Sequence, residues 1–167
     1  MNVRLVVMGV AGCGKSSLAA SLAMRLGLPL IEGDTFHSDE SRRKMASGIP
    51  LTDADREGWL DLLGGMLAQH PDGVVMTCSA LRRAYRDRLR RASPDVRFAY
   101  LAIDRQESLA RVTARASTHF FSSTLVDSQF ETLEVPDGEA GVLHLDATLP
   151  IPQLEAEVAA WLTPQTP

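Results

Sequence analysis

An apolar run near the start of the chain leads directly into a glycine-rich turn, and this junction limits the possible folds more than any other feature. The run Val3–Met8 is rich in valine, as in strands buried on both faces, and the stretch GVAGCGKSS follows it over Gly9–Ser17. The next apolar residues recur at helical spacing: Leu18, Ala19, Leu22, Ala23 and Leu26. The sequence therefore predicts a strand, a glycine loop and a helix in immediate succession.

The glycine-rich stretch matches G-x-x-x-x-G-K-[ST], a pattern that holds the phosphates of a nucleotide when it joins a strand to a helix. Glycines let backbone N–H groups converge on phosphate oxygens, and the helix N-terminus adds positive potential. We expect Lys15 to reach the outer phosphates as a catalytic residue, and the Ser16 hydroxyl to ligate magnesium. The residues predicted to bind ATP here are Gly9, Gly12, Gly14, Lys15, Ser16 and Ser17.

Strand-like and helix-like patterns alternate along the rest of the chain. Further strands are predicted over 30–32, 73–78, 97–103 and 142–145, and further helices over 53–69, 82–92, 108–116 and 151–162. Such alternation favours a three-layer α/β fold with a central parallel sheet of about five strands and helices on both faces. We expect one domain over 1–167, with a short lid at about 116–123, where the core pattern is weak.

The composition of the chain limits the kinds of partner that it is expected to bind. With a formal net charge of −4, the chain offers no broad electrostatic attraction for nucleic acid, so we expect no nucleic-acid partner. Its two cysteines form neither a disulfide framework nor a zinc site. There is no membrane-length apolar segment and no signal-peptide pattern, so a cytoplasmic location and no membrane partner are expected.

A polar region over 32–60 follows the second predicted strand and suggests a binding surface. Asp34 emerges where the strand ends, at the edge where open α/β sheets bind ligands. Its carboxylate can accept a hydrogen bond from an attacking hydroxyl and meet the water shell of magnesium, although a turn or capping role is also open. Asp53 is predicted to cap the next helix, and Arg56 either pairs with that carboxylate or binds an anionic substrate.

Arginines cluster in two later helices. In CSALRRAYRDRLRR, after the third strand, most arginines are expected to form a solvated helix face and to pair with Asp87. Arg82 is the best placed of them to reach a carboxylate substrate. Arg111 and Arg115 precede the lid candidate, four residues apart. Arginines near a lid can neutralise the charge of a transferred phosphoryl group, and closure removes water that would compete as acceptor.

The phosphate-binding pattern alone leaves water, a protein, a nucleic acid or a small alcohol as possible acceptors. A regulatory GTPase is disfavoured because no N-K-x-D motif occurs. Taken with the acceptor-side residues, the segments GD..H, KMASGIPLTDADREGWL, CSALRRAYRDRLR, HFF and LVDSQFETLE resemble the gluconate kinases, a family of P-loop small-molecule kinases, over nearly the whole chain. The resemblance implies ATP- and Mg²⁺-dependent phosphorylation of the 6-hydroxyl of D-gluconate, and it implies a homodimer.

The same resemblance suggests roles for individual residues. Asp34 would be the acceptor-side catalytic carboxylate and, with Ser16, a magnesium site, while Lys15 and Arg115 would act on the phosphoryl group and Arg111 on the nucleotide. The residues implied to bind substrate are Asp34, His37, Lys44, Arg56, Ser79, Arg82, His119 and Gln129. A kinase for shikimate or another sugar acid, or a catalytically weakened nucleotide-binding regulator, is the alternative.

Three positions depart from the family pattern. Ser38 stands where the family usually has proline after the histidine, and Ser41 where it often has asparagine. The lid reads RASTHFF, in place of a shorter form that contains glycine. These departures bear on substrate preference and rate more than on reaction class.

Overall fold

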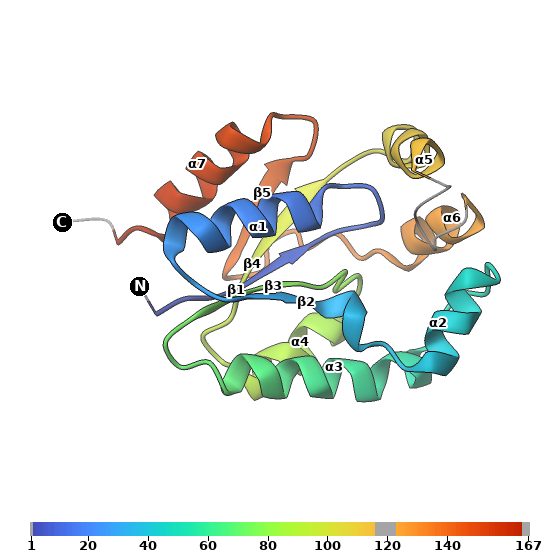
Figure 1. Cartoon of the computed structure of the whole chain (residues 1–167), viewed down its shortest axis with the longest axis horizontal. Coiled ribbons are helices and arrows are strands. Elements are labelled where there is room, and N and C mark those ends of the chain that lie inside the picture. The colour runs from blue at the N-terminus through green and yellow to red at the C-terminus, as the bar shows by residue number, and fades with distance from the viewer. Residues whose placement is uncertain (1, 116–122, 165–167) are drawn as a thin grey trace.

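The computed structural model describes residues 2–115 and 123–164, and it confirms the predicted α/β fold (Figure 1). Five strands form one sheet in the order β2-β3-β1-β4-β5, and every neighbouring pair is parallel. The strands are β1 (Arg4–Met8), β2 (Leu30–Glu32), β3 (Val74–Thr77), β4 (Arg97–Ala102) and β5 (Val142–Asp146). Each predicted strand is present, and the two edges of the sheet are β2 and β5.

Helices cover both faces of the sheet, as predicted. One face carries α1 (Lys15–Leu26) and α7 (Ile151–Leu162), and the other carries α3 (Asp53–Ala68) and α4 (Arg83–Ala92) (Figure 1). The remaining helices, α2 (Asp39–Ala46), α5 (Arg105–Ala114) and α6 (Ser123–Thr132), lie at the end of the molecule beyond the carboxyl ends of the strands. A short 3₁₀ turn, η1 (Gly33–Phe36), follows β2 directly.

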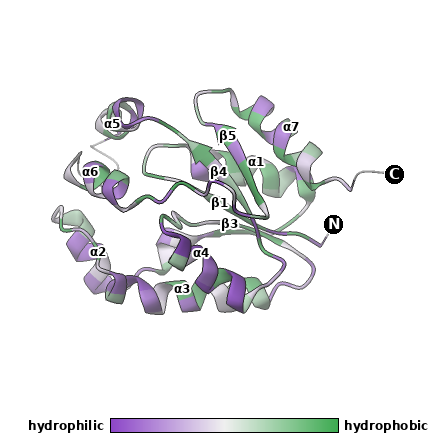
Figure 2. Ribbon diagram, turned by 180° about the vertical axis from the view of Figure 1, so that it is seen from behind, coloured by the Kyte–Doolittle hydropathy of each residue, from purple (hydrophilic) through white to green (hydrophobic). Residues whose placement is uncertain are grey.

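The core lies in two layers, one on each side of the sheet, where the apolar residues gather in Figure 2. Residues of β1 alternate between these layers because successive side chains in a strand point to opposite faces: Val6 and Met8 pack toward α3 and α4, and Leu5 and Val7 toward α1 and α7. Both faces of β1 are thus dry, which explains its unbroken apolar run. Among the described residues, no helix is long and apolar enough to cross a membrane.

Two helices, α2 and α6, were not predicted, and a third begins earlier than expected. The sequence of α2, DESRRKMA, is mostly charged and buries only Ser41 and Met45, so it lacks an apolar stripe. Its start is instead specified by Ser38, whose side chain accepts a hydrogen bond from the backbone of Ser41 at 3.0 Å. Similarly, α5 begins at Arg105 because Asp104 caps it, not at Ser108.

The predicted cap of α3 is wrong by one residue. Thr52, not Asp53, is the N-cap, and its hydroxyl accepts a hydrogen bond from the backbone of Asp55 at 3.1 Å. The Asp55 carboxylate in turn accepts one from the backbone of Thr52 at 2.9 Å, which completes a capping box. Asp53 is therefore released from capping, and its side chain contacts Tyr85 on α4.

Candidate functional site

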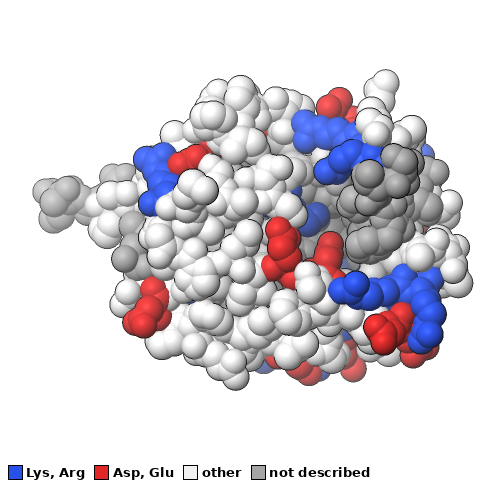
Figure 3. All heavy atoms as spheres, viewed as in Figure 1, with Lys and Arg blue, Asp and Glu red and all other residues white. Residues whose placement is uncertain are grey.

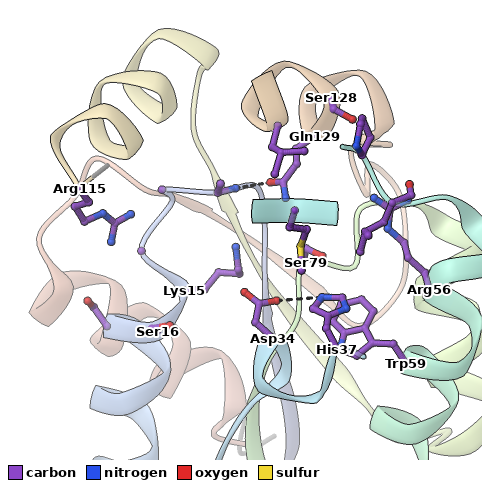
Figure 4. A pocket seen from close by; sticks show the side chains of 18 residues that line it. Lys15, Ser16, Asp34, His37, Arg56, Trp59, Ser79, Arg115, Ser128 and Gln129 are labelled. Atoms are coloured by element: carbon purple, nitrogen blue, oxygen red, sulfur yellow. Dashed lines mark hydrogen bonds and ion pairs between the residues drawn. The ribbon is translucent and has the colours of Figure 1, made fainter. Parts of the chain in front are cut away.

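A cavity, partly open to solvent, lies beyond the carboxyl ends of the strands, where parallel sheets place their ligands. The phosphate loop and α1 form one wall, the η1 turn and α3 another, and α6 a third (Figure 4). Viewed from outside, the hollow has acidic and basic side chains on facing sides (Figure 3). The predicted site residues that line it are Gly12, Gly14, Lys15, Ser16, Ser17, Asp34, His37, Arg56, Ser79, Arg115 and Gln129.

The phosphate loop depends on glycine at its two ends. A Cβ on Gly9 would lie 2.8 Å from the Cys13 sulfur and 3.0 Å from the Leu101 carbonyl oxygen, and φ there is 147°. Gly14, the residue before α1, has a left-handed φ of 95°, which side-chain-bearing residues rarely adopt. Cys13 is buried against this turn, where its sulfur lies close to Gly9.

Lys15 and Ser16 stand at the start of α1, so their side chains reach the helix end that carries positive potential. The Lys15 ammonium donates hydrogen bonds to the carbonyl oxygens of Gly9 at 2.9 Å and Val10 at 3.1 Å. The Ser16 hydroxyl is exposed and donates to the carboxylate of Glu32 at 3.1 Å. Both side chains face the cavity in Figure 4, as a phosphate and magnesium site would require.

Sequence reasoning missed Glu32, the last residue of β2. Its Oε2 atom accepts hydrogen bonds from Ser16 and, at 2.7 Å, from the Thr77 hydroxyl at the end of β3. One carboxylate oxygen thus joins α1 to two strand ends. The available signal was the acidic pair of EGD: Glu32, like Asp34, emerges at the edge where ligands bind.

Asp34 is positioned by a tight approach of two backbones. A Cβ on the preceding Gly33 would lie 2.1 Å from the Thr77 carbonyl oxygen, so only glycine fits. The Gly33 N–H donates to the Thr77 hydroxyl at 3.1 Å, and the Trp59 indole donates to the Gly33 carbonyl at 2.8 Å. These contacts hold the η1 turn so that the Asp34 carboxylate faces the cavity (Figure 4).

His37 and Trp59 form the floor beside Asp34. Their rings stack with centroids 4.0 Å apart and planes at 21°. His37 Nε2 lies 3.7 Å from Asp34 Oδ1, and Nδ1 is buried with no hydrogen-bond partner among the described residues. A histidine of this kind can orient a neighbouring carboxylate or meet a ligand hydroxyl. Trp59 is buried and also lines the cavity.

The structure places several predicted substrate residues outside the cavity lining. Lys44, on α2, forms an ion pair with Asp55 in the first turn of α3, at 2.9 Å. Hydrogen bonds from the Thr52 backbone and from Lys44 hold the pKa of Asp55 below its usual range. Arg82 is the N-cap residue of α4, and its Nε is buried with no hydrogen-bond partner in the described ranges.

Arg111, predicted to act on the nucleotide, joins the end of α5 to the phosphate loop and to the residue after β5. It donates to the carbonyl oxygens of Gly12 at 3.2 Å and Ala147 at 3.1 Å, and it lies outside the cavity lining. Arg115 follows α5 and projects toward the phosphate loop (Figure 4). Of the predicted lid, about 116–123, residues 116–122 lie outside the described residues, and so does His119.

The expectation that the arginines of α4 form a solvated face is wrong for Arg86. It is fully buried and donates to both carboxylate oxygens of Glu139, at 3.0 Å and 2.6 Å, and to the Ala80 carbonyl at 2.7 Å. Ala80 has a left-handed φ of 47°, so this bond fixes a strained turn next to Ser79 in the cavity wall. The surface arginines do pair within the protein, for example Arg88 with Asp61.

Comparisons with known proteins agree with this geometry. A family model described as an AAA domain matches residues 5–135. The chain is 42% identical to the gluconokinase of Gluconobacter oxydans over 84% of this chain and 80% of that protein. It is 40% identical to the thermoresistant gluconokinase of Escherichia coli over 87% of this chain and 85% of that protein. The crystal structure of a gluconokinase from Sinorhizobium meliloti is similar with a TM-score of 0.87 and 42% identity, covering 95% of this chain and 90% of that one.

Proposed function

Because the chain belongs to the gluconokinase family, we propose that it transfers the γ-phosphoryl group of ATP to the 6-hydroxyl of D-gluconate. The observation that carries this proposal is one cavity lined both by the phosphate loop with Lys15 and Ser16, and by Asp34 with Arg56. Donor and acceptor groups therefore face each other across a single space. No observation favours shikimate as the acceptor or a purely regulatory role.

The acceptor residues match the chemistry of a sugar acid. Asp34 accepts the proton of the attacking hydroxyl as that oxygen forms its bond to the γ-phosphorus and the bond from phosphorus to the ADP oxygen breaks. Arg56 binds the carboxylate at the other end of the substrate, since a guanidinium presents paired donors that match a carboxylate. His37 and Ser79 offer further hydrogen-bonding groups in the same cavity.

The donor residues stabilise negative charge that spreads over the phosphoryl oxygens during transfer. Lys15 is close enough to exchange its present bonds to Gly9 and Val10 for phosphate oxygens. Arg115 adds a second positive charge from the end of α5. Because both act on charge that grows in the transition state, their removal is expected to lower turnover more than substrate binding.

Magnesium fits the oxygen ligands of the site. Among the described residues there is no group of three or more His, Cys, Asp or Glu side chains that could hold a metal on its own. Mg²⁺ is commonly held by one or two protein oxygens together with nucleotide phosphates and water. Ser16 would provide that oxygen, and Asp34 and Glu32 would contact the water shell; the ion would neutralise phosphate charge.

Product identification tests the proposal. Purified protein with ATP and Mg²⁺ is expected to convert D-gluconate to 6-phosphogluconate, detected by coupling to 6-phosphogluconate dehydrogenase. Shikimate and other sugar acids are run in parallel and are expected to react far more slowly. Robust phosphorylation of another acid with none of gluconate would show the substrate assignment to be wrong. A homodimer stays a prediction that rests on the family resemblance, and a cytoplasmic location stays a prediction from the sequence patterns.

A further inference from the structure

The Arg56 guanidinium is hydrogen-bonded through one of its three nitrogen atoms. Its Nη1 atom donates to the Leu51 carbonyl oxygen at 2.9 Å and to the Tyr85 hydroxyl at 3.1 Å. In the described part of the chain, every hydrogen bond of this guanidinium leaves from Nη1, which has two hydrogens to give. Nε and Nη2 therefore keep their hydrogens, and the residue lines the cavity. Two adjacent donors of this kind can meet both oxygens of a carboxylate.

The Tyr85 hydroxyl lies between Arg56 and an acid. It donates its only proton to Asp53 Oδ1 and accepts from Arg56 Nη1. The Arg56 guanidinium carbon also lies over the Tyr85 ring, 5.4 Å from its centroid. Tyr85 is 6% exposed, and neither it nor Asp53 lines the cavity. The chain Asp53, Tyr85, Arg56 thus runs from the outside of α3 to the cavity wall.

The tyrosine spacer changes what Arg56 can bind. A direct pair between Asp53 and Arg56 would occupy the guanidinium with a carboxylate of the protein itself. With Tyr85 between them, Asp53 accepts the hydroxyl proton and so turns a lone pair of the hydroxyl oxygen toward Nη1. The other two donors of Arg56, Nε and Nη2, stay available to a ligand. Burial, followed by the bond to Asp53, raises the pKa of Tyr85, so the hydroxyl keeps its proton at neutral pH.

We propose that Tyr85 and Asp53 are positioning residues that fix the Arg56 guanidinium, and that this relay determines the preference for substrates that carry a terminal carboxylate. The inference rests on the proposed function, because it takes Arg56 as the group that binds the sugar-acid carboxylate. It predicts that the relay acts on acid recognition and leaves ATP recognition unchanged, since Lys15 and Ser16 lie across the cavity from Arg56 (Figure 4).

Tyr85→Phe tests the relay with little change in shape. We expect the KM for gluconate to rise by about tenfold, the scale of one lost hydrogen bond to a charged group, and the KM for ATP to stay within about twofold. The ratio of kcat/KM for gluconate to kcat/KM for glucose, which has the same chain length and no carboxylate, is expected to fall by the same factor. Asp53→Asn should act in the same direction more weakly, because an amide oxygen still accepts from the tyrosine.

The chain offers a matched control. Tyr100 is its only other tyrosine; it is buried in the core beside His144 and does not line the cavity. Tyr100→Phe should leave the gluconate-to-glucose ratio unchanged. Two results in Tyr85→Phe would overturn the relay even if the wild type makes 6-phosphogluconate. One is an equal rise in the KM for gluconate and the KM for ATP, and the other is an unchanged gluconate-to-glucose ratio of kcat/KM. If the wild type acts on another sugar acid and not on gluconate, the proposed function is wrong. The relay is then tested by the ratio of kcat/KM for that acid to kcat/KM for glucose.

Discussion

The side-chain amide oxygen of Gln129 accepts a hydrogen bond from the backbone N–H of Ala11 at 2.6 Å, and so joins α6 to the phosphate loop. On the other side of Ala11, its carbonyl oxygen accepts a bond from the buried Ser108 hydroxyl of α5 at 2.6 Å. Both backbone groups of one loop residue are thus bound by the two helices that flank segment 116–122. The conformation of the phosphate loop therefore depends on the placement of this helix pair.

Gln129→Ala is expected to loosen the phosphate loop. Loss of one bond to a backbone N–H should lower the free energy of unfolding by about 1 kcal/mol and raise the KM for ATP several-fold, because the loop N–H groups lose their fixed orientation. Thermal unfolding and initial rates at varied ATP and gluconate measure both effects. Glu131→Ala, an exposed change on the same helix, is the control. If only the KM for gluconate rose, Gln129 would bind substrate, as the resemblance alone implies.

Lys15→Ala is expected to nearly abolish turnover, since the ammonium is the group best placed to stabilise the negative charge on the oxygens of the transferred phosphoryl group. Single-turnover rates at saturating ATP check this. The chain has one other lysine, Lys44, which is paired with Asp55 outside the cavity lining. Lys44→Ala should keep most of the turnover and lower stability slightly. A large loss of gluconate affinity in Lys44→Ala would instead support the substrate role that the resemblance implies.

Asp34→Asn is expected to reduce kcat by about 10²- to 10⁴-fold, the usual contribution of a general base, while ATP binding changes little. The amide keeps the shape of the side chain but cannot take a proton. ATP affinity by calorimetry and kcat by coupled assay separate the two effects. Asp39→Asn, an exposed change in the first turn of α2, is the control. Near-normal kcat in Asp34→Asn would remove Asp34 from the chemistry.

The buried pair of Arg86 and Glu139 predicts a specific loss of stability in acid. Hydrogen bonds from Arg86, with further ones from Arg90, hold the pKa of Glu139 below its ordinary value of 4.5. A carboxyl whose pKa is lowered by folding contributes stability that is complete above about pH 4.5 and is lost as pH falls through the lower folded value. Glu139→Gln should therefore destabilise the protein at pH 7 by about 3 kcal/mol, because it leaves Arg86 buried without its counter-charge.

Urea unfolding at a series of pH values measures this difference. The gap in unfolding free energy between wild type and Glu139→Gln should narrow as pH falls below 4.5. Glu57→Gln removes an exposed partner of Arg88, 4.0 Å away, and should cost little at any pH. A gap that stays constant down to pH 3 would mean that the charge of Glu139 does not contribute to stability.

Much of the fold was predictable because its signals are local. A buried parallel strand needs apolar residues on both faces, so β1 and β3 appear as continuous runs, and Gly9 and Gly14 mark the turn between β1 and α1. A helix that is specified by its cap, with no apolar stripe, is not detected by the spacing of apolar residues. The helix α2 is mostly charged and starts at a serine cap, so its sequence resembles a loop. The start of α3 at Asp53 was predicted correctly, but its N-cap was missed by one residue because Thr52 and Asp53 are both good caps.

By itself, the sequence determined the order of the strands and of the helices with an apolar face, the phosphate loop, and the edge of the sheet where Asp34 emerges, because these follow from neighbouring residues along the chain. Only the tertiary structure decided which side chains meet. Glu32 holds Ser16, Tyr85 separates Asp53 from Arg56, and Arg86 is buried against Glu139. Each of these contacts joins residues that are 16 or more positions apart in the sequence. Their partners are set by strand order and helix packing, which no local pattern encodes.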